Sequence, residues 1–381
     1  MSRPSDDAVA TPKFPRDEAG FFPELRRRVS GYFAEKGVPD RDSWRMYLKS
    51  FVILSFLAVG YAALVFGSVT WWQAIPLAMC VAFAISLIGF AIQHDGNHQG
   101  YSRHRWVNRM AGATLDLIGA SSYVWHWKHG ILHHTYANIN GHDSDIDAGP
   151  VARLSPHQRR YWFHRWQHIY LWPLYAITSP RWHLWGDFKD LASGKIGGHR
   201  IPRPKGWDLV QFVVGKAFSI AFLLGVPMIY HEWWVVVLFY LFVTGMIGVF
   251  LTVVFQLAHC VEEAEFPAPA DATTMLMEDA WAIHQVETTV DFARDNRFLT
   301  WILGGLNFQI VHHLFPRICH VHYPALSRIV ERTSKEYGVR YSVHPTFLAG
   351  VRSHYRWLKR MGRAPAVAVP DPVAANQPVT A

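Results

Sequence analysis

Four long apolar runs dominate the hydropathy pattern of the 381-residue chain, and they predict membrane-spanning helices. The runs cover residues 47–68, 71–93, 207–230 and 233–256. Each is close to the roughly 20 residues that a helix needs to cross about 30 Å of hydrocarbon. Only a few residues separate the first run from the second and the third from the fourth, so the pattern predicts two helical hairpins.

The segments between and after the hairpins mix polar and apolar residues and predict a helical cap. Residues 106–125 and 161–185 combine aromatic with charged residues, which indicates helices lying at the membrane interface. Residues 21–40 predict a basic amphipathic helix, either on the membrane surface or simply solvated. The predicted fold is an all-α integral membrane protein, with four transmembrane helices in two hairpins and a cytoplasmic helical cap.

The two ends of the chain differ in composition from the segment between them. Residues 1–20 are polar, and residues 364–381 are rich in Ala, Pro and Val without any large aromatic side chain, so both predict disorder. Residues 1–20 also contain no apolar core typical of a cleavable signal peptide. We therefore expect one folded domain, residues 21–363, between two disordered ends.

Charge and aromatic content set the predicted orientation. The chain has 37 Lys and Arg against 29 Asp and Glu, and the basic residues flank the apolar runs. Anionic membrane lipids are therefore the expected partner, and nucleic acid is not. Both hairpin tips lack Lys and Arg, so the positive-inside rule places both termini and the middle segment in the cytoplasm. The 17 Trp and 15 Tyr suit a protein that lines two membrane interfaces.

The chain carries three short histidine clusters next to the apolar runs. Their members are His94, His98, His129, His133, His134, His312 and His313. Residues four apart on a helix share one face with Cβ atoms roughly 6 Å apart, so His129 and His133 have chelating geometry. Neutral imidazole suits iron, zinc, copper and nickel, and seven ligands exceed the four of a tetrahedral site, which indicates two ions.

His259 and several carboxylates extend this set. His259 follows the fourth run directly, as His94 follows the second, and we expect it to be an eighth ligand. Asp95 and the aspartates at 143, 145 and 147 are expected to orient ligand rings through their outer nitrogens. The segment 143–147 is equally compatible with a plain turn. All eight histidines fall on the predicted cytoplasmic side, which supports a single site.

Six further polar residues lie where the pattern predicts interface or membrane. For five of them we expect interfacial or surface positions: His126, His157, His164, His168 and His183. Lys216 stands inside the third apolar run, where an unpaired charge costs roughly 3 kcal/mol. This lysine either snorkels to the interface or faces a polar cavity.

The histidine spacings resemble the signature of the membrane fatty acid desaturase family. That family has boxes of the form H-x(3,4)-H, H-x(2,3)-H-H and (H/Q)-x-x-H-H around four transmembrane helices. Here the boxes read His94-x3-His98, His129-x3-His133-His134 and Gln309-x2-His312-His313, and the resemblance runs from Tyr47 to Tyr355. Gln309 in place of His is typical of the front-end branch, which is similar to linoleoyl-CoA and related Δ5/Δ6-type desaturases.

The resemblance implies an O2-dependent diiron enzyme that introduces a cis double bond into an acyl chain. It implies that the eight histidines hold two iron ions, with Gln309 and Asn307 near the metal; Asp95 and Asn138 complete the predicted surroundings. Many front-end relatives carry a fused cytochrome b5 domain with an H-P-G-G haem motif, which is not found here. We therefore expect a separate electron donor, a ferredoxin or a free cytochrome b5.

The acyl substrate is expected in an apolar tunnel that leads to the metals. A C–H bond offers no polar handle, so only its position selects it. Candidate wall residues are Trp125, Trp281, Phe292 and Trp301. The acyl carrier, whether CoA, a lipid or a carrier protein, stays open.

Two other functions compete with desaturation. An all-imidazole dimetal site beside a membrane favours iron and O2 over hydrolysis, because hydrolytic two-metal sites commonly use bridging carboxylates. The same metals also serve hydroxylases, acetylenases and ketolases acting on lipids, and only the product separates these reactions. A His-rich metal transporter would hold its ligands near the midplane of the spans, whereas these histidines follow the span ends.

Overall fold

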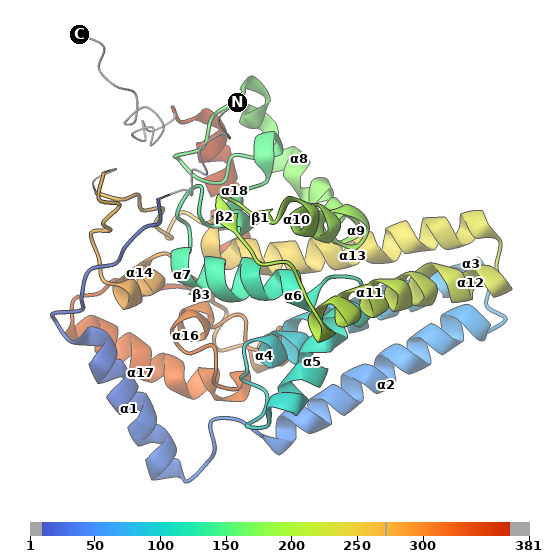
Figure 1. Cartoon of the computed structure of the whole chain (residues 1–381), viewed down its shortest axis with the longest axis horizontal. Coiled ribbons are helices and arrows are strands. Elements are labelled where there is room, and N and C mark those ends of the chain that lie inside the picture. The colour runs from blue at the N-terminus through green and yellow to red at the C-terminus, as the bar shows by residue number, and fades with distance from the viewer. Residues whose placement is uncertain (1–9, 271–272, 366–381) are drawn as a thin grey trace.

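A computed structural model describes residues 10–270 and 273–365, and within them four helices are long and apolar enough to cross a membrane. They form two hairpins that lie side by side (Figure 1). The spans are Trp44–Phe66, Trp71–Asn97, Trp207–Tyr230 and Trp233–His259. The first is helix α2 and the fourth is helix α13. The four predicted spans are confirmed.

The second and third spans are interrupted by π-helical turns. In the second, α3 (Trp71–Leu87) continues through η1 (Ile88–Gln93) into α4 (His94–Asn97). In the third, α11 (Trp207–Ile220) continues through η8 (Ala221–Gly225) into α12 (Val226–Tyr230). π-Helical turns are rare and often occur at functional sites, and η1 leads directly into the first histidine cluster.

Exposed tryptophans mark both ends of the spans. Those at the hairpin tips are Trp71, Trp72, Trp233 and Trp234, and those at the opposite ends are Trp44, Trp106, Trp207 and Trp301. The indole ring prefers the boundary between lipid and water, since it is apolar and carries one donor. The two sets therefore outline the two membrane interfaces that the composition predicts.

A helical cap covers one end of the spans, on the left of Figure 1. Its longer helices are α1 (Phe21–Lys36), α5 (Arg105–Leu117), α8 (Gln167–Leu174), α10 (Asp187–Ser193), α14 (Trp281–Glu287), α17 (Tyr323–Glu336) and α18 (Phe347–Arg363). Its shorter helices are α6 (Ser122–Trp125), α7 (His134–Tyr136), α9 (Thr178–Arg181), α15 (Arg297–Ile302) and α16 (Gln309–Leu314). Its π- and 3-10 turns are η2 (His126–His133), η3 (Ser144–Ile146), η4 (Gly149–Val151), η5 (Trp162–Trp166), η6 (Tyr175–Ile177), η7 (Trp182–Gly186) and η9 (His320–His322).

Two small sheets complete the cap. β1 (Lys195–Ile196) pairs antiparallel with β2 (His199–Arg200). β3 (Val290–Phe292) pairs parallel with β4 (Ser342–His344), with Val290 opposite Ser342. These strands have only two or three residues each, so the fold remains helical as predicted.

Helix α1 packs into the cap. Its apolar side chains Phe21, Leu25 and Val29 are buried in one core cluster with Leu326 and Val330 of α17. The opposite face is charged and exposed. Because the apolar face is already covered by protein, α1 is a solvated helix of the cap, which decides between the two alternatives for residues 21–40.

Residues 161–185 form a broken path of short helices along α13. Pro173 lies inside α8 and Pro180 inside α9, and proline removes a backbone donor from a helix. The path approaches α13 closely where a Cβ on Gly248 would lie 2.6 Å from the Tyr175 carbonyl oxygen. Exposed Ile169, Ile177 and Trp185 line its outer side, as expected for an interfacial segment.

The prediction of interfacial or surface positions is wrong for three of the five histidines. His164, His168 and His183 are buried, whereas His126 is exposed and His157 is half-buried. The imidazole of His164 hydrogen-bonds the Pro150 carbonyl at 2.8 Å, and His183 bonds the hydroxyls of Tyr240 and Ser219. The broken path folds against both the cap and the spans, so the rings of His164 and His183 satisfy buried polar groups.

The predicted disordered ends are described only in part. Lys13 shares two backbone hydrogen bonds of 2.8 Å, one with Met275 and one with Met277, and Phe14 contacts His284. Residues 10–20 therefore have a defined path, contrary to the prediction. The carbonyls of Ala364 and Pro365 accept bonds from the buried Arg153. Residues 1–9 and 366–381 lie outside the described part of the chain.

Candidate metal centre

The eight predicted ligands converge from five elements at the junction of spans and cap. His94 opens α4 at the end of the second span and His98 follows its last turn; η2 carries His129 and His133. His134 begins α7, and His259 ends α13. The last two, His312 and His313, lie on α16. Histidines that are adjacent in sequence and histidines from distant segments thus form one cluster.

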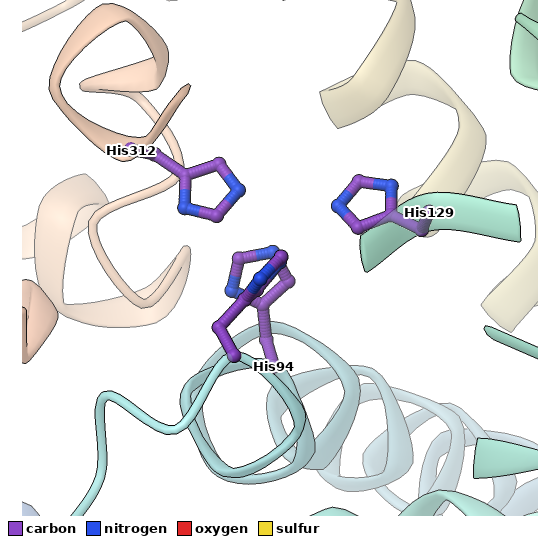
Figure 2. A group of neighbouring side chains, drawn as sticks. His94, His129 and His312 are labelled. Atoms are coloured by element: carbon purple, nitrogen blue, oxygen red, sulfur yellow. The ribbon is translucent and has the colours of Figure 1, made fainter. Parts of the chain in front are cut away.

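The ligand nitrogens fall into two groups. Four histidines, His94, His98, His129 and His312, have nitrogens within 4.8 Å of one another (Figure 2). Three others, His133, His259 and His313, form a second group by the same distance. Two groups of imidazoles match the two ions that the ligand count indicates.

His134 lies between the two groups. Its ring centroid is 4.5 Å from that of His98 and 4.6 Å from that of His312 in the four-histidine group. On the other side it is 4.4 Å from His313, with the two rings nearly parallel. The structure therefore brings all eight predicted ligands together, although His134 belongs to neither group by distance.

The expected chelating pair of His129 and His133 lies together, although the two rings fall in different histidine groups. Their rings lie 4.9 Å apart, but one belongs to the four-histidine group and the other to the group of three. Asp145 forms a third, overlapping group with both. His129 and His133 still share one face of η2, and their stacked rings lie where the two groups meet.

Several ring nitrogens of the cluster are buried without a hydrogen-bond partner among the described residues. They are Nε2 of His98, His129, His133, His312 and His313, and both nitrogens of His134 and His259. A buried polar atom left unsatisfied costs about 1–3 kcal/mol, so a fold does not gather nine of them without compensation. Metal coordination satisfies such nitrogens, and the cluster therefore fits two metal ions.

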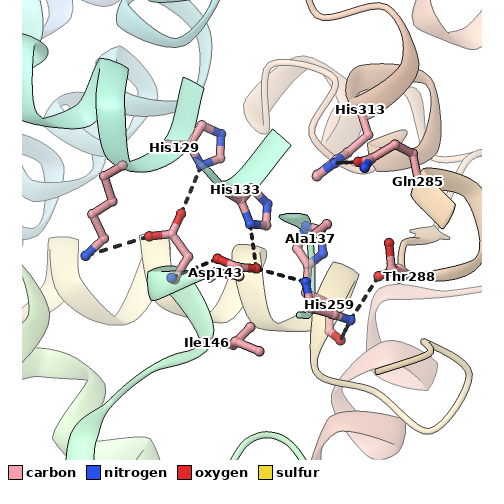
Figure 3. Close-up of polar contacts among 12 residues, drawn as sticks. His129, His133, Ala137, Asp143, Ile146, His259, Gln285, Thr288 and His313 are labelled. Atoms are coloured by element: carbon pink, nitrogen blue, oxygen red, sulfur yellow. Dashed lines mark hydrogen bonds and ion pairs between the residues drawn. The ribbon is translucent and has the colours of Figure 1, made fainter. Parts of the chain in front are cut away.

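Outer hydrogen bonds fix the orientation of three rings (Figure 3). His133 Nδ1 lies 2.9 Å from Asp143 Oδ2, and His129 Nδ1 lies 3.1 Å from Asp145 Oδ2. His313 Nδ1 lies 2.8 Å from Gln285 Oε1. Each acceptor holds the proton on Nδ1 and leaves Nε2 free to face the cluster, the usual arrangement around bound metals.

Two outer partners of the ligand rings were not predicted from the sequence. Gln285 on α14 and Tyr323, whose hydroxyl lies 3.3 Å from His312 Nδ1, belong to no histidine box. Asp147 differs from its two neighbours, since it accepts the backbone N–H of Gly149 and serves the turn. Both alternatives for residues 143–147 therefore hold: Asp143 and Asp145 orient ligand rings, and Asp147 serves the turn.

Burial keeps most of the cluster in the neutral form that binds metal. Desolvation lowers the pKa of His98, His134, His312 and His313 well below the usual value, and it lowers the pKa of His129 to about 4. For His133 burial acts in the same direction, but the Asp143 carboxylate outweighs it and raises the pKa. An imidazole must be neutral to coordinate, so this environment favours binding.

Three of the four predicted neighbours of the metal are buried and have no hydrogen bond to a ligand ring within the described part of the chain. Asn138 donates to the carbonyls of His259, Glu265 and Thr288, and so anchors the end of the fourth span. Asn307 donates to Thr300, with its Oδ1 unpaired among the described residues, and Gln309 is buried. The fourth, Asp95, has an oxygen 4.0 Å from His94 Nδ1.

The predicted tunnel residues separate into two pairs. Trp125 lies against the four-histidine group, with its ring 4.5 Å from that of His129, and Trp281 donates to the His134 carbonyl at 3.2 Å. Phe292 is fully buried against Phe347, and Trp301 is 42% exposed. Only the first pair touches histidines of the cluster, and the tunnel itself stays a prediction.

Comparison with known proteins agrees with this site. Residues 69–345 match the model of the family described as fatty acid desaturase. The chain is 40% identical to the sn-1 linoleoyl-lipid 6-desaturase of Arthrospira platensis over 355 residues, 91% of this chain and 94% of that protein. It is 39% identical to the enzyme of the same name from Synechocystis sp., over 91% of this chain and 96% of that protein.

A more distant relative extends the comparison. The acyl-lipid (8-3)-desaturase of Physcomitrium patens is 35% identical over 346 residues, 90% of this chain and 72% of that protein. The family match contains all three histidine boxes and His259. Since the match also covers most of the chain, this protein belongs to the fatty acid desaturase family, whose members are oxidoreductases.

Proposed function

We propose that this protein is an O2-dependent diiron desaturase of the front-end type, which introduces a cis double bond into a lipid-bound acyl chain. The observation that supports it most directly is one buried cluster of histidines in two groups, in which nine ring nitrogens have no hydrogen-bond partner among the described residues. The relatives support the reaction and the lipid-bound substrate, because they are named acyl-lipid and linoleoyl-lipid desaturases.

The residues that would hold the two irons follow from the groups. His94, His98, His129 and His312 would bind one ion, and His133, His259 and His313 the other, with His134 available to either. When bound, the irons supply the activation of O2 that removes two hydrogens from adjacent methylenes. The balance is one acyl CH2–CH2, one O2, two electrons and two protons giving one CH=CH and two waters.

The protein's own contribution is position and exclusion of water. Burial of the cluster removes bulk solvent, and the outer partners Asp143, Asp145 and Gln285 hold ring orientation. The acyl chain has no polar group near the reacting carbons, so its placement against the cluster decides which C–H bonds react. Trp125 is the aromatic side chain best placed to contact it.

Orientation and electron supply complete the proposal. Both termini and the metal centre face the cytoplasm, in accord with the basic flanks of the spans. The two electrons come from a separate protein, a ferredoxin or a cytochrome b5, on that side.

The test combines metal content with lipid products. The full chain is expressed in a host that supplies such a donor, purified anaerobically in detergent, and assayed for iron, while the host's lipids are analysed for new double bonds. About two irons per chain and a new unsaturated acyl lipid are expected, one ion for each group. A hydroxylated product would contradict desaturation, and a metal-free protein would contradict the proposed centre.

A further inference from the structure

A lysine, a histidine and an aspartate form a buried hydrogen-bonded row beside the metal centre. Lys49 of α2, His320 of η9 and Asp95 of α4 are 4%, 3% and 2% exposed. Lys49 Nζ lies 3.1 Å from His320 Nε2, and His320 Nδ1 lies 2.9 Å from Asp95 Oδ2. The row therefore joins the first span to the end of the second through a segment far away in sequence.

The chemistry of the three groups fixes the direction of each hydrogen bond. An ammonium group only donates, so Lys49 donates to His320 Nε2, and the ring proton must be on Nδ1. That proton is donated to Asp95, and the backbone N–H of His320 donates to the same oxygen at 3.1 Å. A neutral imidazole thus links a buried cation to a buried anion, and burial lowers the pKa of His320, which favours this neutral form.

The row is attached to the four-histidine group from two sides. Asp95 lies in the turn between His94 and His98, and the rings of His94 and His312 are 4.4 Å apart. Three residues after His320, the hydroxyl of Tyr323 lies 3.3 Å from His312 Nδ1. One short segment, 320–323, therefore contacts both the turn that carries the first box and a ligand of the third box.

The backbone around this contact is too tight to shift freely. The N–H of Gly100, just after the first box, donates to the Asp95 carbonyl at 2.8 Å. A Cβ on Gly100 would lie 3.0 Å from the Pro316 carbonyl oxygen and 3.2 Å from that of Ile318. The two loops meet backbone to backbone, and the hydrogen bonds between His320 and Asp95 join the same two segments.

We propose that His320 and Lys49 are positioning residues for the four-histidine metal group. They hold Asp95, and with it the turn carrying His94 and His98, at the distance from His312 that one metal ion requires. The inference rests on the metal centre proposed above. It adds two residues outside the histidine boxes and assigns them to one of the two ions.

The test uses paired variants of His320 in the full chain, purified in detergent and loaded with Co(II) under anaerobic conditions. His320→Phe keeps an aromatic ring and removes both ring hydrogen bonds, whereas His320→Gln can still accept from Lys49 and donate to Asp95. His320→Phe is expected to lower the affinity for one of two ions by about tenfold or more, as measured by chelator competition. His320→Gln is expected to stay close to the wild type, a rescue that space-filling alone would not produce.

Reference variants identify the ion that is lost. The visible spectrum of the remaining Co(II) in His320→Phe is expected to match that of His94→Ala, which lacks a ligand of the four-histidine group, and to differ from that of His259→Ala. Lys49→Met should weaken the same ion. The control is the double variant Lys216→Met/Asp187→Asn, which removes another buried lysine pair and should keep both ions.

The outcomes separate the two proposals. A wild type that binds no metal overturns the proposed centre and this inference together. Two ions bound equally well in wild type and His320→Phe overturn the inference alone, as does equal loss of both ions or a spectrum matching His259→Ala. If His320→Phe does not fold, Lys49→Met decides by the same criteria.

Discussion

Two lysines are buried inside membrane spans, where an ammonium group is unfavourable, and they differ in how each reaches an aspartate. Lys49 of α2 and Lys216 of α11 are 4% and 5% exposed, and each has an aspartate in its surroundings. Lys216 contacts its aspartate directly, with Nζ 2.8 Å from Asp187 Oδ2, and also donates to the Gly119 carbonyl at 2.7 Å. Lys49 reaches Asp95 only through His320.

The difference lies in what each aspartate touches next. Asp187 accepts the backbone N–H of Ser121 and so ties α10 and the start of α6 to the third span. Asp95 sits beside His94 in the first histidine box. A buried ion pair gains little net stability but is destabilising to break, so the Lys216–Asp187 pair penalises displacement of the segments it holds. The Lys216–Asp187 pair therefore secures the fold, whereas the proposed role of the Lys49–His320–Asp95 row is to secure the metal centre.

The largest effect is expected from a ligand itself, because the comparison holds only if the cluster binds metal. His133→Ala should reduce desaturation by more than about 100-fold, beyond what loss of an outer partner usually costs. Iron content should fall, while membrane insertion, followed by membrane fractionation, should be unchanged. Full activity with wild-type iron would remove the basis of the comparison.

Breaking the Lys216–Asp187 pair should strongly reduce the stability of the protein but leave its metal binding unchanged. Lys216→Met leaves Asp187 buried without its cation and is expected to cost about 3–5 kcal/mol of unfolding free energy. Thermal unfolding in detergent measures this loss, and cobalt binding in the surviving folded fraction should be unchanged. Adding Asp187→Asn should restore much of the stability, and a loss of metal in this double variant would show that the two networks are not separate.

An outer partner of a ligand should give an intermediate effect on metal alone. Asp143→Ala removes the carboxylate that holds His133 Nδ1 and should lower metal affinity by about 10–100-fold. Asp147→Ala is the matched control, since Asp147 accepts the Gly149 backbone N–H in the turn and has no hydrogen bond to a ligand ring among the described residues. Equal losses in both variants would mean that the turn, and not the carboxylate on His133, matters.

The smallest effect is expected at the hairpin tip, far from both networks. Gln73 Oε1 accepts the backbone N–H of Thr70 at 2.9 Å at the start of α3. Gln73→Ala should cost about 0.5–1.5 kcal/mol of stability, the usual net value of one hydrogen bond, with no change in metal affinity. A thermal shift accompanied by metal loss would show that the tip and the centre are coupled.

The predicted ligands were all found at one place, but their division was not foreseen. Spacing alone puts His129 and His133 on one helical face, as the structure has them, but it does not show that their rings fall in different histidine groups. Gln285, Tyr323 and His320 carry no pattern that distinguishes them from other polar residues of the cap. Their roles depend on which segments the cap brings beside the boxes.

The same limit applies to residues 161–185 and to α1. The sequence shows that these segments are amphipathic, but both protein and lipid can cover an apolar face. Burial of Phe21 and Leu25 under α17, and of His164 and His183 within the cap and against the spans, follows from long-range packing. The local pattern of apolar and polar residues does not show whether protein or lipid covers such a face.

By itself, the sequence determined the four spans, the helical class and the eight histidines, because these depend on length, hydropathy and residue type within short windows. Only the tertiary structure decided how the histidines divide into two groups, which residues hold their outer nitrogens, and what neutralises each buried lysine. The physical reason is distance along the chain: His320 and Asp95 are 225 residues apart, and their hydrogen bond exists only once spans and cap have packed together.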